Sequence, residues 1–305
     1  MGEQPACQEF AQMTYNWNSP VGCVTMTFIF HTPSPPLNVY IDSFYTPNES
    51  LPLPREKILP LPGLDLKINF GGGFQVYDGD QSEPFTTLTE SWVLGLWTKS
   101  HIVDWPEDLQ YIGVNFKPGG AYPFLGLPLS ELRNQIVSLD VIWGTLAAEL
   151  RERLYAAPTI QARFALLEQF LLARLCETPR ELKAVQCAVA EIARHHGALS
   201  IRALSERMGM SQKHLIVQFK QLVGCTPKEL GRLYRFGDIL ASIDLTQPVD
   251  WTLVAHRFFF HDQSHFIRDF REFSGHTPTD YLRLRRQMHV ERPDRTQHLR
   301  LLPVG

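Results

Sequence analysis

One nine-residue pattern, F-x-x-x-x-G-x-T-P, occurs twice in the last third of the chain and constrains the fold more than any other feature. The first copy runs from Phe219 to Pro227 and the second from Phe270 to Pro278, at a constant offset of 51 residues. A fixed period of this size indicates that one supersecondary unit is used twice. We therefore expect two copies of one small helical unit in this part of the chain.

The residues around the first copy predict two short helices joined by a sharp turn. Ile201–Met208 has helical spacing, and Gly209 is a residue that tolerates a positive φ. Ser211 is a good N-cap for a second helix, whose apolar stripe is Leu215, Phe219 and Leu222. The other side carries polar side chains that suit base edges and phosphates in a major groove: Gln212, Lys213, His214, Gln218 and Lys220. A solvated surface helix would show the same face, but the turn and the repeat favour DNA contact.

The second copy repeats this arrangement with more aromatic residues. Thr252–Phe258 predicts the first helix and Asp262–Phe273 the second, with Asp262 or Ser264 as the N-cap. The expected buried stripe is Phe266, Phe270 and Phe273. Polar residues lie on the remaining faces or just before the helix: His261, Gln263, His265, Arg268 and Arg271.

Between the copies, the segment Lys228–Leu245 has the apolar spacing of one continuous helix. Eighteen helical residues span roughly 27 Å. Successive major-groove turns on one face of DNA are separated by roughly 34 Å. A stiff helix of this length would let a single chain span two helical turns of DNA.

The distribution of charge agrees with a nucleic-acid partner for the C-terminal part. The chain as a whole has a formal net charge of -3. Residues 1–179 contain 10 Lys and Arg against 19 Asp and Glu, a net of −9, whereas residues 180–305 contain 19 against 13, a net of +6. Because the N-terminal part is acidic and the C-terminal part is basic, we expect the positively charged surface that attracts DNA in the C-terminal part.

Several motifs of the repeat region carry a family resemblance. They are Leu204–Ser211, Leu215, Phe219, Asp262-Gln-Ser-His-Phe266, Phe270, Gly275-His-Thr-Pro278 and Tyr281-Leu-Arg283. With these motifs, residues from about 184 to 287 resemble the tandem helix-turn-helix domain of AraC/XylS-type transcription regulators. The resemblance implies sequence-specific binding of double-stranded DNA and allows RNA polymerase and a small-molecule effector as further partners. The DNA contacts are predicted at Ser211, Gln212, Lys213, His214, Gln218, Lys220, His261, Asp262, Gln263, Ser264, His265, Arg268 and Arg271.

One residue departs from the family's pattern. The turn of the second unit normally contains a glycine, and this chain has Phe259 there. A non-glycine residue held at positive φ costs on the order of 1 kcal/mol. Either the turn differs locally or the second unit binds DNA weakly. We hypothesise that the first unit supplies most of the base contacts.

Residues 1–138 predict a mainly-β domain of short strands. The candidate strands are Val21–Phe30, Leu64–Phe70, Phe74–Tyr77, Ser91–Lys99 and Gln110–Lys117. The many prolines between residues 33 and 62 exclude long helices and favour edge strands. This pattern predicts a barrel-like (cupin-like) fold or a sandwich. The stretch from Val114 to Leu132 also resembles the N-terminal domain of one subgroup of AraC-type regulators.

Two helices are predicted after the strands, at Val141–Leu154 and Thr159–Leu175. In the first of them, the expected inward residues are Ile142, Leu146, Leu150 and Leu154. Either these helices only pack on the barrel, or they also form an antiparallel pair at a homodimer interface. The predicted organisation is α+β and multidomain: a sensor domain at 1–138, a helical connector at 139–178, an AraC-type domain at 179–288 and a flexible tail at 289–305.

The sequence offers no cofactor or metal site. Gly71–Gly73 lacks the phosphate-loop pattern and predicts a turn. Only His31 and His101 precede residue 195, too few for a cupin-type metal centre. His261 and His265 have a spacing that suits a metal, but no third ligand is in view, so DNA contact is preferred. The five cysteines are scattered and predict reduced thiols.

The cellular location is predicted from what the chain lacks. No apolar run approaches the roughly 18 residues that cross a bilayer, so no membrane association is expected. The first residues, Met1–Ala6, have neither the basic nor the apolar part of a secretory signal. These features predict a cytoplasmic protein.

Two alternatives to a regulator were weighed. DNA-repair alkyltransferases share the helix-turn-helix module, but they use a cysteine in a P-C-H-R context that this chain lacks. The chain also lacks G-x-S-x-G and H-E-x-x-H motifs, so we predict no enzyme. The other alternative is a ligand-binding or protein-interaction module without direct operator contact. For a regulator, the family resemblance implies that effector binding shifts an equilibrium between domain arrangements.

Overall fold

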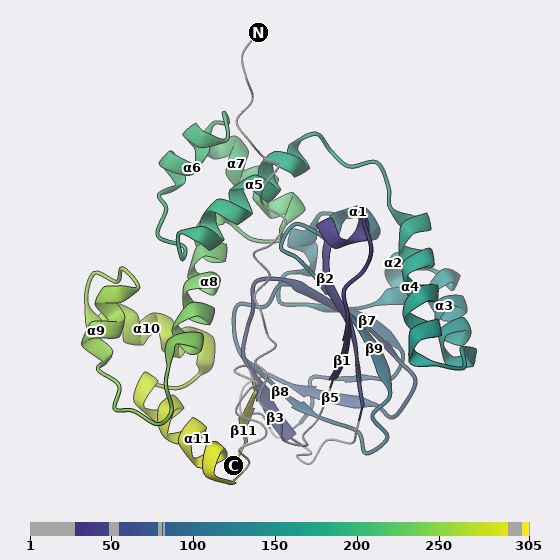
Figure 1. Ribbon diagram of the computed structural model, residues 1–305, viewed down its shortest axis with the longest axis horizontal. Helices are drawn as coiled ribbons and strands as arrows, with labels where there is room; N and C mark the ends of the chain where they lie inside the picture. Colours follow the sequence, from purple (N-terminus) through teal and green to yellow (C-terminus); the bar gives the residue numbers. More distant parts are fainter. Residues whose placement is uncertain (1–27, 49–54, 79–80, 82, 292–300, 305) are drawn as a thin grey trace.

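The chain folds into a β-rich N-terminal part and a helical C-terminal part that lie side by side (Figure 1). The computed structural model describes residues 28–48, 55–78, 81, 83–291 and 301–304. The predicted α+β architecture, a mainly-β part followed by an all-helical part, is confirmed.

The described strands form two antiparallel sheets and not a closed barrel. The first sheet has the order β1-β2-β9-β4-β7-β10. Its strands are β1 (Phe28–His31), β2 (Ile41–Pro47), β9 (Tyr111–Phe116), β4 (Leu64–Asn69), β7 (Ser91–Leu94) and β10 (Ile136–Ser138). The second sheet has the order β11-β3-β8-β5-β6. Its strands are β11 (Leu301–Pro303), β3 (Arg55–Ile58), β8 (His101–Asp104), β5 (Phe74–Tyr77) and β6 (Thr86–Leu88).

Four of the predicted strands correspond to β4, β5, β7 and β9, although β7 ends at Leu94. Of the segment Val21–Phe30, residues 21–27 lie outside the described residues, and its last residues begin β1. The prediction that the proline-rich region holds only edge strands is wrong, because β2 pairs with β1 on one side and β9 on the other. Pro36 precedes this strand and Pro47 ends it, so the prolines bound β2 without interrupting its hydrogen-bond ladder.

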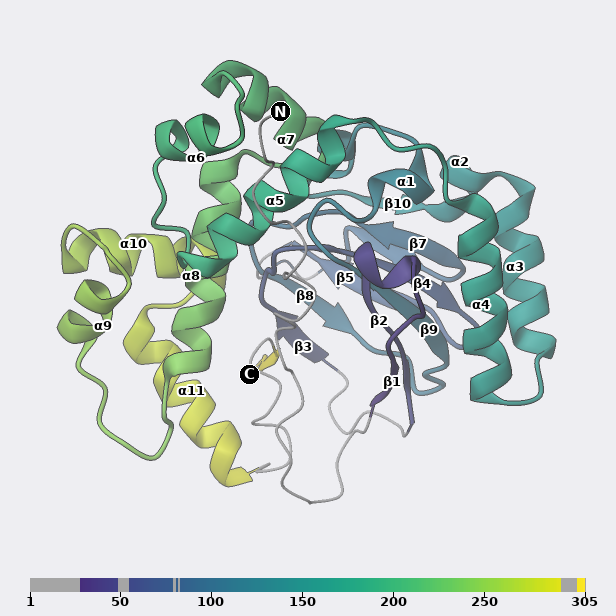
Figure 2. The same cartoon turned by 45° about the horizontal axis from the view of Figure 1, so that its top comes forward.

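The main hydrophobic core lies on one face of the first sheet. Leu64, Leu66 and Ile68 alternate along β4 and are buried in this core. The helices α2 (Leu139–Trp143), α3 (Thr145–Ala156) and α4 (Ile160–Arg174) lie together at one side of the sheets, where α2 contacts β7 and β10 (Figure 2). Leu150, Leu154, Leu167 and Leu171 bring their apolar sides into the same core. These helices therefore complete the β-rich part, whereas a dimer interface stays a prediction.

The predicted helix Val141–Leu154 is broken in the structure. Gly144, at φ 60° and ψ −141°, separates α2 from α3. The break changes which residues of this segment point into the core. Trp143 and Ala147 are buried, whereas the predicted core residue Leu146 is 41% exposed. The second predicted helix is confirmed as α4, with Thr159 as its N-cap.

The C-terminal part is helical from α5 onward. Its helices are α5 (Glu181–Arg194), α6 (Ile201–Arg207), α7 (Gln212–Leu222), α8 (Pro227–Ser242), α9 (Trp251–Arg257), α10 (Gln263–Ser274) and α11 (Pro278–Glu291). Three short elements, α1 (Tyr122–Leu125), η1 (Leu37–Val39) and η2 (Leu129–Leu132), lie in the N-terminal part. The predicted connecting helix is α8, whose 16 residues are two fewer than expected and span roughly 24 Å.

The end of the chain returns to the N-terminal part. Helix α11 continues to Glu291, and Leu301–Pro303 form β11, which pairs antiparallel with β3. Leu302 is fully buried, and the buried Arg285 of α11 donates from Nη1 to the Leu301 carbonyl at 3.2 Å. The prediction of a flexible tail at 289–305 is therefore wrong at both of its described ends. Residues 292–300 lie outside the described residues.

Candidate nucleic-acid interface

The first helix-turn-helix unit consists of α6 and α7. Gly209 between them has a φ of 65°, a conformation that L side chains rarely adopt. The Ser211 hydroxyl accepts a hydrogen bond from the His214 backbone N–H at 3.2 Å and caps α7. The three residues of the predicted apolar stripe are fully buried: Leu215, Phe219 and Leu222. The predicted turn, cap and stripe are all confirmed.

The polar residues of this unit face solvent. Gln218 is half-buried, and the other predicted contacts are exposed: Ser211, Gln212, Lys213, His214 and Lys220. The two lysines lie on the side of α7 that is not packed against the core. This face can therefore meet an anionic, hydrogen-bonding surface such as DNA.

The second unit consists of α9 and α10, and Asp262 is the cap of α10. Asp262 Oδ1 accepts from the His265 backbone N–H at 2.7 Å, and its Oδ2 lies 3.1 Å from His261 Nδ1. These two contacts, the backbone one first, hold the pKa of Asp262 below its usual range. Ser264, the other candidate cap, is exposed. The Asp262 carboxylate is thus already engaged by its own chain.

The remaining predicted contacts of the second unit are also on the surface. They are His261, Gln263, Ser264, His265, Arg268 and Arg271, all exposed. The predicted stripe of Phe266, Phe270 and Phe273 is buried. Among the residues that the structure describes, no group of three or more His, Cys, Asp and Glu side chains is placed to hold a metal ion.

The turn of the second unit keeps a positive φ in spite of its side chain. Phe259 has a φ of 59°, and its ring is 65% exposed. The residues on either side turn inward: Phe258 is buried and Phe260 is half-buried. The turn therefore has the geometry usual for a glycine, with the strain that a Cβ adds.

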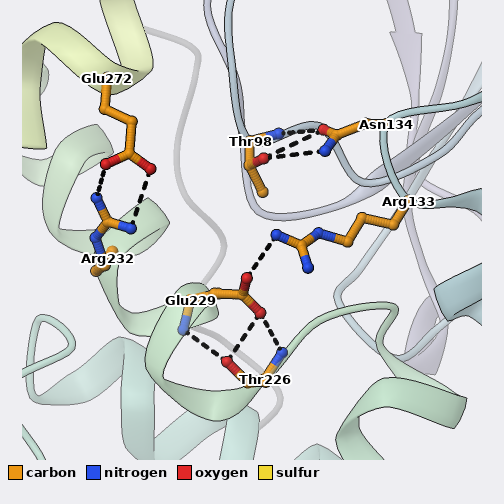
Figure 3. A network of polar contacts seen from close by, with 7 residues as sticks. All are labelled: Thr98, Arg133, Asn134, Thr226, Glu229, Arg232 and Glu272. Atoms are coloured by element: carbon orange, nitrogen blue, oxygen red, sulfur yellow. Dashed lines mark hydrogen bonds and ion pairs between the residues drawn. The ribbon is translucent and has the colours of Figure 1, made fainter.

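Arg232 of α8 holds α10 from its buried side, a role that the sequence analysis missed. Its guanidinium donates to Asp269 (Nη2–Oδ1 2.9 Å, Nε–Oδ2 3.1 Å) and to Glu272 (Nη2–Oε2 2.5 Å), the latter pair being drawn in Figure 3. Burial lowers the pKa of Arg232, but the hydrogen bonds to the two carboxylates outweigh burial and raise it. Asp269 and Glu272 are three residues apart on one helix face, which indicates a shared cationic partner. The sequence does not identify that partner, because it lies in another helix.

The first unit is attached to the N-terminal part through the start of α8. Thr226 and Glu229 form a capping box, and Arg133 Nη2 lies 2.6 Å from Glu229 Oε1 (Figure 3). Burial would raise the pKa of Glu229, but the hydrogen bonds from Thr226 and the charge of Arg133 bring it below its usual range. A Cβ on Gly224 would lie 3.0 Å from the Leu129 carbonyl oxygen, so the two parts are in close contact here.

The second unit is attached to the N-terminal part at a separate place. Lys57 of β3 has its Nζ 3.2 Å from Nε2 of His276, in the loop between α10 and α11. The pairing of β11 with β3 adds a backbone link at the same strand. Each unit therefore has its own contact with the β-rich part.

The comparison with protein families concerns both parts of the chain. Residues 204–284 match the family model of a helix-turn-helix domain, and the match includes both units. Residues 204–284 are therefore a helix-turn-helix domain of the AraC type. Residues 29–138 match a second family model, described as a domain of unknown function. A comparison with curated proteins found no match.

Solved structures similar to this chain include two of ToxT from Vibrio cholerae. An apo form is 13% identical, with a TM-score of 0.40, over 78% of this chain and 96% of that one. A form bound to an unsaturated fatty acid is 12% identical, with a TM-score of 0.39, over 85% and 97%. The AraC-like transcriptional activator CuxR is 14% identical, with a TM-score of 0.27, over 68% and 78%. Within the described residues, none of the helices has the length and apolar character of a membrane span.

Proposed function

We propose that this chain is an AraC-type regulator that inserts α7 and α10 into successive major-groove segments of double-stranded DNA and thereby controls transcription in the cytoplasm. The observation that carries the proposal is the pair of capped helices, each with one face in the core and one polar face in solvent. Gln212 and Gln263, in the first turns, suit base edges. The cations further along suit phosphates: Lys213, Lys220, Arg268 and Arg271.

The first prediction concerns salt. Each neutralised phosphate contributes about −0.9 to the slope of log K for binding against the logarithm of the salt concentration. If these four cations neutralise four phosphates, affinity should therefore fall about a hundredfold between 50 and 200 mM salt. Fluorescence anisotropy with a duplex selected by the protein from a random pool measures this slope. Changing all four cations to glutamine should flatten it. Arg153→Gln, which removes an exposed cation from α3, should not. An unchanged slope in the fourfold variant would contradict the proposed interface.

We further propose that the effector binds in the layer between the two sheets, because this layer is both aromatic and charged. Phe74 of the second sheet contacts Trp92 of the first, with ring centroids 5.1 Å apart. Tyr45 Oη donates to Asp65 Oδ2 at 2.7 Å, and Lys67 pairs with the same carboxylate. The rest of this layer is a cluster of buried aromatic and apolar side chains, so the charged pair of Asp65 and Lys67 is costly there unless it has a polar partner.

Two buried polar atoms in this part of the chain support a polar ligand. Asp65 Oδ1 and His101 Nδ1 have no hydrogen-bond partner among the described residues. Burial, and then the charge of Lys67, lower the pKa of His101 to about 3, so its imidazole is neutral at physiological pH. Buried polar atoms normally have partners. A small polar molecule would supply them, which is the ligand class that we propose.

The second prediction tests this location. A polar metabolite that raises the thermal unfolding temperature of the full chain should lose its effect in Lys67→Met, since this change removes a charge from the layer. Lys99→Met is the matched control, because Lys99 also pairs with an aspartate, Asp78, but both side chains are nearly half exposed. An equal response of the two variants to the same metabolite would place the site elsewhere.

Self-association is the remaining part of the proposal. Four large apolar side chains of α2, α3 and α4 are exposed: Val141, Leu146, Tyr155 and Leu172. Exposed apolar side chains on neighbouring helices support the dimer interface expected from the sequence. Because the proposed function is control of transcription, RNA polymerase is a further proposed partner.

A further inference from the structure

Two strained residues lie at the junction between the helix-turn-helix units, one in the loop between α5 and α6 and one in the turn of the second unit. His196 follows α5 and has a φ of 49°, and Phe259 in the second turn has a φ of 59°. Among the described non-glycine residues, only Asn134 shares this property. The ring of Phe258, directly before the strained turn residue, has its centroid 6.3 Å from that of His196. Strain of this kind persists where the surrounding structure holds it and is frequent at functional positions.

Helix α8 bridges the two strained segments with one arginine. Arg235 donates from Nη2 to the Gly197 carbonyl at 3.2 Å, in the loop that leads from α5 into the first unit. The same guanidinium lies over the ring of Phe260 in the second unit, 4.8 Å from its centroid. One turn further on, Asp238 lies 2.7 Å from His196 Nδ1. A single face of α8 thus contacts the loop between α5 and α6 and the turn of the second unit.

The contacts on either side of this junction allow little movement. A Cβ on Gly197 would lie 2.0 Å from the Gly231 carbonyl oxygen, so the loop rests on the backbone of α8. On the other side, Arg232 fixes α10 through Asp269 and Glu272. Arg232 and Arg235 are three residues apart and therefore lie on neighbouring positions of one helix face. This face of α8 therefore holds both α10 and the loop that leads into α6 of the first unit.

We propose that Arg235 is a positioning residue that, with His196, sets the separation of α7 and α10, so that the regulator distinguishes operators by the spacing of their half-sites. The inference rests on the proposed DNA-binding function. It also assigns Phe259, the residue at positive φ in the second turn, a structural role other than DNA contact. The strained turn directs Phe258 toward His196 and Phe260 toward Arg235, which a flexible glycine would not fix.

The first experiment measures binding to DNA of altered spacing. A duplex selected by the wild-type chain from a random pool is compared with versions that carry one or two extra base pairs between the half-sites, and with a single half-site. The wild type should prefer the selected spacing by about tenfold or more, the order of one well-placed charge-assisted contact. Arg235→Ala should bind the single half-site with unchanged affinity and lose most of the preference. Arg235→Lys, which keeps the charge without the planar fork, should lose part of it.

The controls separate positioning from simple stability. Arg202→Ala removes an arginine of the first unit whose side chain pairs with Glu206 within the same helix, so it should leave the spacing preference intact. If Arg235→Ala keeps the full preference, or weakens the single half-site as much as the selected duplex, the inference is overturned. A wild-type chain that binds none of these duplexes would instead overturn the proposed function and this inference with it.

The second experiment needs no DNA. Spin labels attached to unnatural ketone residues at positions 213 and 263 report the distance between α7 and α10 in the full chain. The distance distribution should be narrow in the wild type and broader in Arg235→Ala and in Phe259→Gly. Equal widths in all three chains would show that Arg235 does not position the helices, whatever the outcome of the DNA measurements.

Discussion

Replacing Gln212 and Lys213 together with alanine should lower the affinity for a selected operator by about a hundredfold, the sum expected for one base contact and one phosphate contact. The paired replacement Gln263→Ala and Arg268→Ala should cost less. The reason for the difference lies in the second unit, where the turn holds Phe259 at positive φ and the Asp262 carboxylate places a negative charge at the start of α10.

The comparison is made by anisotropy at one salt concentration, because affinities for DNA depend steeply on salt. Both double variants keep the buried stripes of their helices, so thermal unfolding of each should match that of the wild type. An equal or larger loss from the Gln263 and Arg268 pair would reject the hypothesis that the first unit makes most of the base contacts.

Replacing Leu302 with aspartate should destabilise the full chain by about 3 kcal/mol, since it removes a buried leucine and introduces a charge in the core. Leu302 is fully buried in β11, a strand that pairs with β3 and whose Leu301 carbonyl accepts a hydrogen bond from the buried Arg285 of α11. Loss of this strand should also expose the backbone amides of β3. Urea unfolding measures the first effect and hydrogen–deuterium exchange the second.

The neighbouring residue provides the matched control. Leu301 is only half-buried on the same strand, so Leu301→Asp should cost clearly less and leave β3 protected. If both aspartate variants unfold alike, β11 does not secure the second unit to the sheet. If neither changes the exchange of β3, the pairing of β11 contributes nothing to that edge.

The helical part could be predicted from the sequence because its signals are local. Gly209, Ser211 and Asp262 each act within one helical turn of their own position, and the repeat doubles every signal. Local signals gave a wrong prediction where a single residue broke the helical periodicity. Gly144 interrupts the continuous apolar pattern, so that Leu146 lies at the surface.

The missed features depend on residues that are distant in the sequence. β2 is an interior strand because β9, about seventy residues later, pairs with it. β11 pairs with β3 across most of the chain. Arg232 finds Asp269 in another helix, 37 residues away. No spacing rule within one segment identifies such partners, so these contacts required the structure. The DNA contacts and the domain boundaries stay predictions.

The pairing of β3 with β11 also bears on how the protein is made. A ribosome adds roughly 5–20 residues per second, so the second sheet waits roughly 10–50 s between the emergence of its edge strand and the arrival of the residues that cover it. During that interval the backbone groups of β3 are an open template for other nascent chains. We therefore expect slower translation between these two strands to increase aggregation, and a chain truncated before residue 301 to keep an open edge at β3.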